Sequence, residues 1–135
     1  DVNLASRLEG QSKNYGVDIV ISETTRKAAE EFATIELDLI QVKGKTVPVR
    51  IFALIGDEEV LASDWFSNLS SIHSKLISSY RSQEWDDSFD LIAEARSVAG
   101  PKYDGLYDLF EERVSEYKAD PPGSEWDGVF VAKDK

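Results

Sequence analysis

Several residue types are absent or scarce in this chain, and each absence excludes a class of chemistry. The 135 residues contain no cysteine, which excludes disulfide bonds, cysteine-ligated zinc and a cysteine nucleophile. The single histidine, His73, has no second histidine with which to build the usual multi-histidine metal site. Methionine is also absent, even at position 1, and we expect the chain to be a segment of a longer parent protein.

Basic residues and long apolar runs are scarce as well. The 15 lysines and arginines are outnumbered by 26 acidic residues, which gives a formal net charge of −11. This charge argues against nonspecific binding to nucleic acid or to an anionic membrane, so we expect neither as a partner of this segment. The apolar runs span only a few residues, which excludes a transmembrane segment or signal peptide within these residues.

The first part of the sequence predicts a helix, a strand and a second helix. Gly16 is suited to a positive φ at the end of the first helix. Residues 18–21 are short, apolar and β-branched, which predicts a buried strand. Ser22 can cap the next helix. The apolar face predicted for that helix comprises Thr25, Ala28, Ala29 and Phe32.

Two alternating segments then predict a β-hairpin with Gly44 at its turn. Pro48 lacks an amide donor and should lie at an edge or a non-bonded position. The residues expected on the inward faces of the two strands are Ile35, Leu37 and Leu39, followed by Val47, Val49, Ile51 and Ala53.

Asn3 and Arg7 are the strongest candidates for functional side chains. Because they are four positions apart in a helix-compatible segment, they would share one helical face and could reach a single ligand. Asparagine offers a donor and an acceptor, and arginine offers a permanent charge with donors suited to phosphate oxygens. The alternative is an ordinary amphipathic helix on which both side chains are solvated.

Two motifs stand in a fixed order: Val-Asn-x-Ala-Ser-Arg-Leu at residues 2–8, and Val-Lys-Gly-Lys at residues 42–45. Together they make residues 1 to about 55 resemble the C-terminal part of the catalytic domain of bacterial class III nucleotidyl cyclases. The resemblance implies that Asn3 orients the ribose, Arg7 stabilises charge at the phosphoryl group, and Lys43 contacts the polyphosphate. Lys45 has no such role in the family. For both lysines, a solvated hairpin tip is the alternative.

The resemblance also implies an activity and its requirements. The parent protein would convert ATP to cyclic AMP and pyrophosphate, using two Mg²⁺ or Mn²⁺ ions. In the family, the Asp residues that bind these ions, and the residues that read the purine, precede Asp1. Sites of the family form across a homodimer interface. We therefore expect the isolated segment to be inactive.

The sequence predicts an α+β fold with three parts. Residues 1–56 would form the C-terminal part of a ferredoxin-like cyclase domain, residues 57–120 an all-helical extension, and residues 121–135 a tail. The stretch from Tyr80 to Phe89 resembles the turn of a tetratricopeptide helix pair, so the extension is expected to be TPR-like. The expected inward stripes are Trp65, Leu69, Ile72, Leu76 and Tyr80; Phe89, Ile92 and Ala93; and Leu106, Phe110, Val114 and Tyr117.

The tail resembles the ending of bacterial adenylate cyclases with an extracytoplasmic CHASE-type sensor. This resemblance implies a cytoplasmic segment whose parent is anchored in the inner membrane. Trp65, Trp85 and Trp126 are expected to anchor packing between helices.

Other polar residues have simpler interpretations. The acidic groups at residues 30–31, 57–59 and 86–87 are expected to be solvated faces or helix N-termini, not metal sites. His73 is expected to have a structural or surface role. The alternative to a cyclase is a non-catalytic regulatory or oligomerisation module of cyclase ancestry, and metal-binding Asp residues upstream would distinguish the two.

Overall fold

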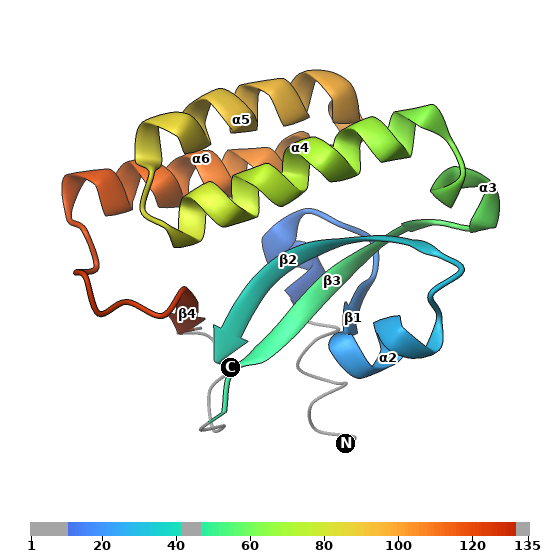
Figure 1. Cartoon of the computed structure of the whole chain (residues 1–135), viewed down its shortest axis with the longest axis horizontal. Coiled ribbons are helices and arrows are strands. Elements are labelled where there is room, and N and C mark those ends of the chain that lie inside the picture. Colours follow the sequence, from blue (N-terminus) through green and yellow to red (C-terminus); the bar gives the residue numbers. More distant parts are fainter. Residues whose placement is uncertain (1–10, 42–46, 132–135) are drawn as a thin grey trace. The chain divides into compact units, whose positions relative to one another are not determined.

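The computed structural model describes residues 11–41 and 47–131 and shows an α+β protein with a four-stranded mixed sheet. The chain forms two compact units (Figure 1). The sheet unit extends to Ser63 and includes the strand at Val129–Val131 near the other end of the chain, and the helical unit comprises Asp64–Gly128.

The sheet unit is built around its central strand β3, which pairs with β1 on one side and β2 on the other, both antiparallel. The strand order is β1-β3-β2-β4, and β4 pairs with β2 in parallel. Its elements are β1 (Val20–Ser22), α2 (Glu23–Ala28), β2 (Ala33–Gln41), β3 (Val49–Gly56), α3 (Glu58–Leu61) and β4 (Val129–Val131).

The helix before β1 ends as the sequence predicts. Residues 11–15 are helical, and Gly16 has a φ of 67°. The amide of Val17 donates to the carbonyl of Ser12 at 3.1 Å, and that of Gly16 donates to the carbonyl of Lys13 at 3.4 Å. These two bonds form a Schellman motif, which satisfies carbonyls at the helix end and makes Tyr15 the last helical residue.

Helix α2 begins as predicted but ends earlier. The Ser22 hydroxyl accepts a hydrogen bond from the Thr25 amide at 3.2 Å, which confirms the predicted cap. The helix ends at Ala28, no residue within it is buried, and Phe32 remains 38% exposed. The prediction of an apolar face that extends to Phe32 was therefore wrong. The amides of Ala29 and Phe32 bond to carbonyls only three residues earlier, so tight turns replace the last helical turn.

The predicted antiparallel pairing is confirmed, with β2 and β3 paired from Ala33 opposite Gly56 to Ile40 opposite Val49, whereas the predicted turn at Gly44 lies outside the described residues. Pro48 lies just before β3, outside the ladder. The predicted alternation fails after Leu37, because a bulge lies between Glu36 and Asp38. Beyond this bulge Asp38 and Ile40 are buried and Leu39 is only half-buried, so the prediction that Leu39 faces inward was wrong.

The helical unit consists of three helices that lie side by side and alternate in direction (Figure 1). They are α4 (Asp64–Arg81), α5 (Trp85–Ala99) and α6 (Asp104–Ala119), with a short 3₁₀ turn at Pro101–Tyr103. Helix α5 ends before Gly100-Pro101, and α6 ends shortly before Pro121-Pro122-Gly123, where proline and glycine do not continue a helix. Among the residues that the structure describes, no helix is both long and apolar enough to cross a membrane.

The inward faces of α4 and α6 largely match the predicted stripes, but that of α5 matches its stripe only at Ile92. The buried residues of α5 are Ser88, Ile92, Ala95 and Ala99, whereas Ala93 is exposed and Phe89 half-buried. Ser88 can be buried because its hydroxyl lies 2.8 Å from the Ser79 hydroxyl and donates to the Glu84 carbonyl. A polar residue thus starts the inner face, one position before the predicted Phe89.

An aromatic cluster joins α4, α5, α6 and the segment after α6. Its ring centroids lie 5.1–6.2 Å apart, and Trp85 stacks on Tyr117 at 5.6 Å. The cluster comprises Tyr80, Trp85, Tyr117 and Trp126. Trp85 and Trp126 therefore anchor packing as predicted.

Trp65 has a different environment from the other two tryptophans. Its side chain is 37% exposed, so its predicted place in the inward stripe was wrong, and Phe66 is buried instead. The indole nitrogen Nε1 nevertheless donates to the Val98 carbonyl at 2.7 Å. This bond ties the start of α4 to the end of α5 while one side of the ring stays in water.

The sequence predicts boundaries between segments at residues 56/57 and 120/121, and the two compact units have boundaries of their own. The sheet unit continues through α3 to Ser63, and part of the predicted tail forms β4 in the sheet. The helical unit is therefore placed in the sequence between two parts of the sheet unit.

Phe110 provides a test of the helical core. Its side chain is fully buried, so Phe110→Ala should lower the free energy of unfolding by about 3–5 kcal/mol. The same substitution at half-exposed Phe32 should cost no more than about 1 kcal/mol, because little packing is lost there. Urea unfolding of both variants measures the difference, and equal losses would contradict the described burial.

Candidate functional site

The three predicted site residues, Asn3, Arg7 and Lys43, lie outside the residues that the structure describes. Their proposed roles therefore remain predictions from the sequence. The structure describes the segments that flank these residues in the sequence, and we call these segments the framework. The helical residues 11–15 follow Asn3 and Arg7 in the chain, and strands β2 and β3 flank the segment that contains Lys43.

A buried polar contact links the two parts of this framework. The Tyr15 hydroxyl donates to the Asp38 carboxylate oxygen Oδ2 at 2.6 Å, and the other oxygen, Oδ1, accepts from the Leu39 amide at 2.9 Å. Tyr15 is 1% exposed and Asp38 is fully buried. A carboxylate in such a place requires hydrogen bonds to offset the loss of hydration, and both of its oxygens have a donor.

A second group of polar side chains belongs to α2, β2 and β3 of the sheet unit. The Arg50 guanidinium lies 2.5 Å from a Glu36 carboxylate oxygen and 3.7 Å from one of Glu23. The Arg26 guanidinium lies over the Phe52 ring at 5.2 Å. Because Arg50 is held between two carboxylates and Arg26 against a ring, these cations have a structural use in the described framework.

In the helical unit, His73 and Tyr107 form a buried polar pair. The His73 nitrogen Nδ1 lies 2.9 Å from the Tyr107 hydroxyl, and the imidazole meets the Phe110 ring edge-on at 5.8 Å. His73 is 2% exposed. Burial, and secondarily the neighbouring Tyr103, raises the pKa of the Tyr107 phenol well above its ordinary value. The pair thus satisfies polar atoms in a core, in agreement with the structural role expected for His73.

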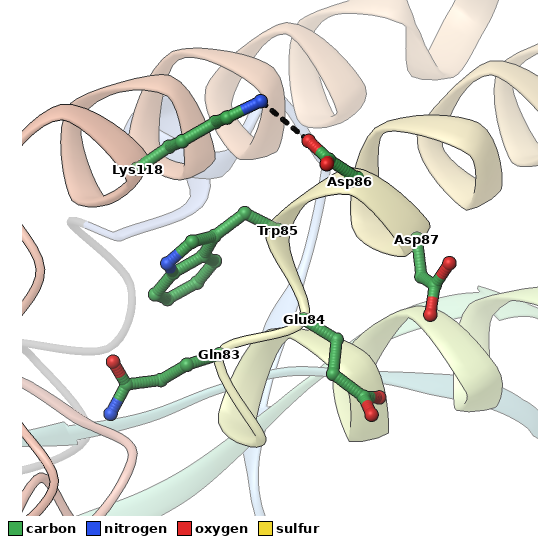
Figure 2. A pocket seen from close by; sticks show the side chains of 6 residues that line it. All are labelled: Gln83, Glu84, Trp85, Asp86, Asp87 and Lys118. Carbon is green, nitrogen blue, oxygen red and sulfur yellow. Dashed lines mark hydrogen bonds and ion pairs between the residues drawn. The ribbon is translucent and has the colours of Figure 1, made fainter.

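An open pocket of about 320 Å³ lies where α5 begins, next to Trp85 (Figure 2). The Lys118 nitrogen lies 2.5 Å from an Asp86 carboxylate oxygen, and Figure 2 shows that Glu84 and Asp87 point away from this pair. Asp86 and Asp87 lie in the first turn of α5, where the helix dipole favours negative charge. The residues that line the pocket are Gln83, Glu84, Trp85, Asp86, Asp87 and Lys118.

The other acidic groups have comparable local explanations. Asp57 caps α3 by accepting hydrogen bonds from the amides of Glu59 and Val60. Glu30 and Glu31 are exposed in the turns after α2. Within residues 11–41 and 47–131, no group of three or more histidine or acidic side chains is arranged to hold a metal ion.

Sequence reasoning missed the Tyr15–Asp38 contact. The available signal was a charged residue between the apolar positions Leu37 and Leu39, but regular alternation placed it on the solvent side. Only the bulge brings the Asp38 side chain into the interior.

Comparison of the chain with protein-family models, with curated proteins and with solved structures found no match.

The raised pKa of Tyr107 predicts a pH dependence of stability. Because its folded pKa lies above its unfolded value of about 10, its contribution is fully present below pH 10 and is lost as pH rises further. Replacing Tyr107 with Phe should therefore make the fall in unfolding free energy above about pH 10 less steep. Urea unfolding between neutral and strongly alkaline pH measures this slope. A variant with the wild-type slope would show that this phenol does not contribute.

Proposed function

We propose that residues 1–56 are the C-terminal part of a ferredoxin-like class III cyclase domain whose parent converts ATP to cyclic AMP and pyrophosphate. The supporting observation is the antiparallel pairing of β2 and β3, the strands that flank Val42-Lys43-Gly44-Lys45 in the sequence. Before it come a helical segment, a strand and a helix, the order that the resemblance implies. The Asn3 and Arg7 motif stands directly before that series.

The proposed reaction is an intramolecular phosphoryl transfer. The ribose 3′-oxygen forms a bond to the α-phosphorus, the bond from this phosphorus to the bridging oxygen breaks, and pyrophosphate leaves. Asn3 orients the ribose, Arg7 stabilises the charge that develops at the phosphoryl group, and Lys43 binds the departing pyrophosphate. Activation of the hydroxyl and neutralisation of phosphate charge come from two Mg²⁺ or Mn²⁺ ions held by upstream Asp residues.

The proposal includes an arrangement for the parent. Two copies form a homodimer in which Asn3, Arg7 and Lys43 of one subunit complete the metal centre of the other. The helical unit is a TPR-like extension that serves packing or assembly. The segment is cytoplasmic, and its bacterial parent is anchored in the inner membrane.

Asn3→Ala and Arg7→Ala in the parent protein test the catalytic assignment. Each should lower kcat by about two orders of magnitude or more, because a transition-state donor is lost. The melting temperature should hardly change. Cyclic AMP formation at saturating ATP measures kcat, and Lys13→Ala, which removes a nearby exposed cation, is the control. Wild-type kinetics in the Arg7 variant would contradict the assignment and favour the non-catalytic module.

The two hairpin lysines test the polyphosphate contact. Lys43→Ala should mainly raise KM for ATP, because the proposed contact exists before chemistry begins. Lys45→Ala removes the same charge two residues later and should have the smaller effect. Steady-state kinetics of both variants in the parent measure KM for ATP. Equal increases in KM would mean that only the local positive potential matters.

The isolated 135-residue chain should form no cyclic AMP above a no-protein control, with either Mg²⁺ or Mn²⁺ and ATP. The physical reason is that the proposed metal ligands are not among its residues. Metal-dependent turnover by the highly purified chain would contradict the placement of those ligands.

A further inference from the structure

One face of the sheet in the sheet unit is only partly covered. The Ile21 side chain shares this face with Phe52, its cross-strand partner. Arg26 of α2 covers the Phe52 ring. Helix α2 has only six residues, however, and none of them is buried. A helix of this length spans about 9 Å, so it can cover only part of the face.

Apolar side chains remain exposed to water on the same face, next to the part that α2 covers. The Leu54 amide donates to the Ile19 carbonyl at 3.1 Å, which continues the pairing of β1 with β3 by one position. Because side chains alternate along a strand, both residues lie on the face that carries Phe52. Ile19 is 48% exposed, and Leu54 is half-buried.

Phe32 extends this exposed area. It is two residues before Thr34, the partner of Leu54 in β2, so it belongs to the same end of the sheet. Phe32 is 38% exposed. We call Ile19, Phe32 and Leu54 together the end surface. Exposed apolar groups that gather in one place and have a polar rim are typical of sites for protein partners.

Carboxylates flank the end surface and form its rim. One precedes Ile19 in the chain, two precede Phe32, and three follow the last residue of β3, which pairs with Ala33. The six are Asp18, Glu30, Glu31, Asp57, Glu58 and Glu59, and all are exposed. They outnumber the two cations of α2, Arg26 and Lys27. The rim of the end surface is therefore negative.

The charge of the rim selects between the possible occupants of the end surface. The whole chain has a net charge of −11, which opposes an anionic membrane or a nucleic acid. A second copy of the chain would bring the same carboxylates to the contact, and like charges across an interface are costly. A basic protein segment with one apolar side has the complementary charge and also matches the apolar residues.

We propose that the end surface docks a basic, amphipathic segment of a partner protein. The apolar side chains of this segment pack on Ile19, Phe32 and Leu54, and its lysines or arginines face the carboxylates of the rim. The inference does not rest on cyclase activity, because every residue that carries it belongs to the described part of the sheet unit.

A model peptide tests the apolar contact on the 135-residue chain. The probe is a fluorescently labelled helical peptide of leucine and lysine, with its leucines on one face. Ile19→Ser should raise the Kd about tenfold, because an apolar anchor is lost. Val131→Ser, the control, changes a 59% exposed valine on the opposite edge strand and should keep the wild-type Kd. Fluorescence anisotropy measures both values.

Phe32→Ala is the second variant of the end surface, and it decides the question if Ile19→Ser does not fold. It should also raise the Kd of the peptide, because the ring no longer covers the leucines of the probe. No binding to the wild-type chain, or the wild-type Kd in these variants, would overturn the proposal.

Two matched pairs of substitutions test the rim. Glu30→Gln with Glu31→Gln removes two carboxylates beside the end surface, whereas Glu112→Gln with Glu116→Gln removes two exposed ones from α6. The first pair should weaken peptide binding and reduce its dependence on salt, and the second should change neither. Equal effects of the two pairs would show that the peptide responds only to net charge, which would overturn the proposal.

Two further measurements test the other occupants. A dimer in analytical ultracentrifugation that Ile19→Ser converts to a monomer would show that a second copy occupies the end surface. A parent protein that does not bind the peptide, although the isolated chain does, would show that other residues of the parent cover it. Either result overturns the proposal. The expected result is a monomeric chain, with peptide binding by both chain and parent that Ile19→Ser weakens.

Discussion

The bulge in β2 is the constraint on which the arrangement of the sheet unit depends. Without it, Asp38 would lie on the same face as Glu36, and the Tyr15 hydroxyl would have no carboxylate to meet. With the bulge, Glu36 of β2 pairs with Arg50. Two positions later, Asp38 is a buried acceptor for the Tyr15 hydroxyl of the preceding helix. A local irregularity in the backbone thus links elements that are 23 residues apart in the chain.

In the helical unit, aromatic rings join several elements. The cluster of Tyr80, Trp85, Tyr117 and Trp126 brings α4, α5, α6 and the following segment to one place. The Gln83 side-chain amide also donates to the Gly123 carbonyl at 2.7 Å, which ties the α4–α5 connection to that segment. Large rings in edge-to-face and stacked contacts give this small unit a well-defined core. In the proposed function this rigidity serves packing or assembly.

The sequence predicted those features that depend on local chemistry. Gly16 ends its helix, Ser22 caps α2, and β2 and β3 pair as the two alternating segments predicted. Two of the failures came from tertiary contacts. Burial of Ser88 depends on the Ser79 hydroxyl of another helix, and burial of Asp38 depends on Tyr15. Hydrophobic periodicity identifies neither contact, because it places the polar residues Ser88 and Asp38 on the solvent side.

The same distinction between local chemistry and tertiary contacts applies to the candidate site. Asn3, Arg7 and Lys43 can be proposed as site residues from sequence motifs alone, because their residue types and order are suited to phosphate recognition. The Tyr15–Asp38 contact cannot, because it requires a fold that brings two distant segments together. The motifs therefore support the proposal of phosphate-binding residues, whereas the structure gives the buried contacts of the described residues.

In the proposed function, this chain supplies one half of a nucleotide cyclase site that a second subunit completes. The most direct test mixes two inactive forms of the parent, one carrying Arg7→Ala and the other lacking the upstream metal-binding Asp residues. If sites form between subunits, mixed dimers contain one intact site, and random pairing should restore about a quarter of the wild-type cyclic AMP formation. A mixture as inactive as its two components would contradict the claim.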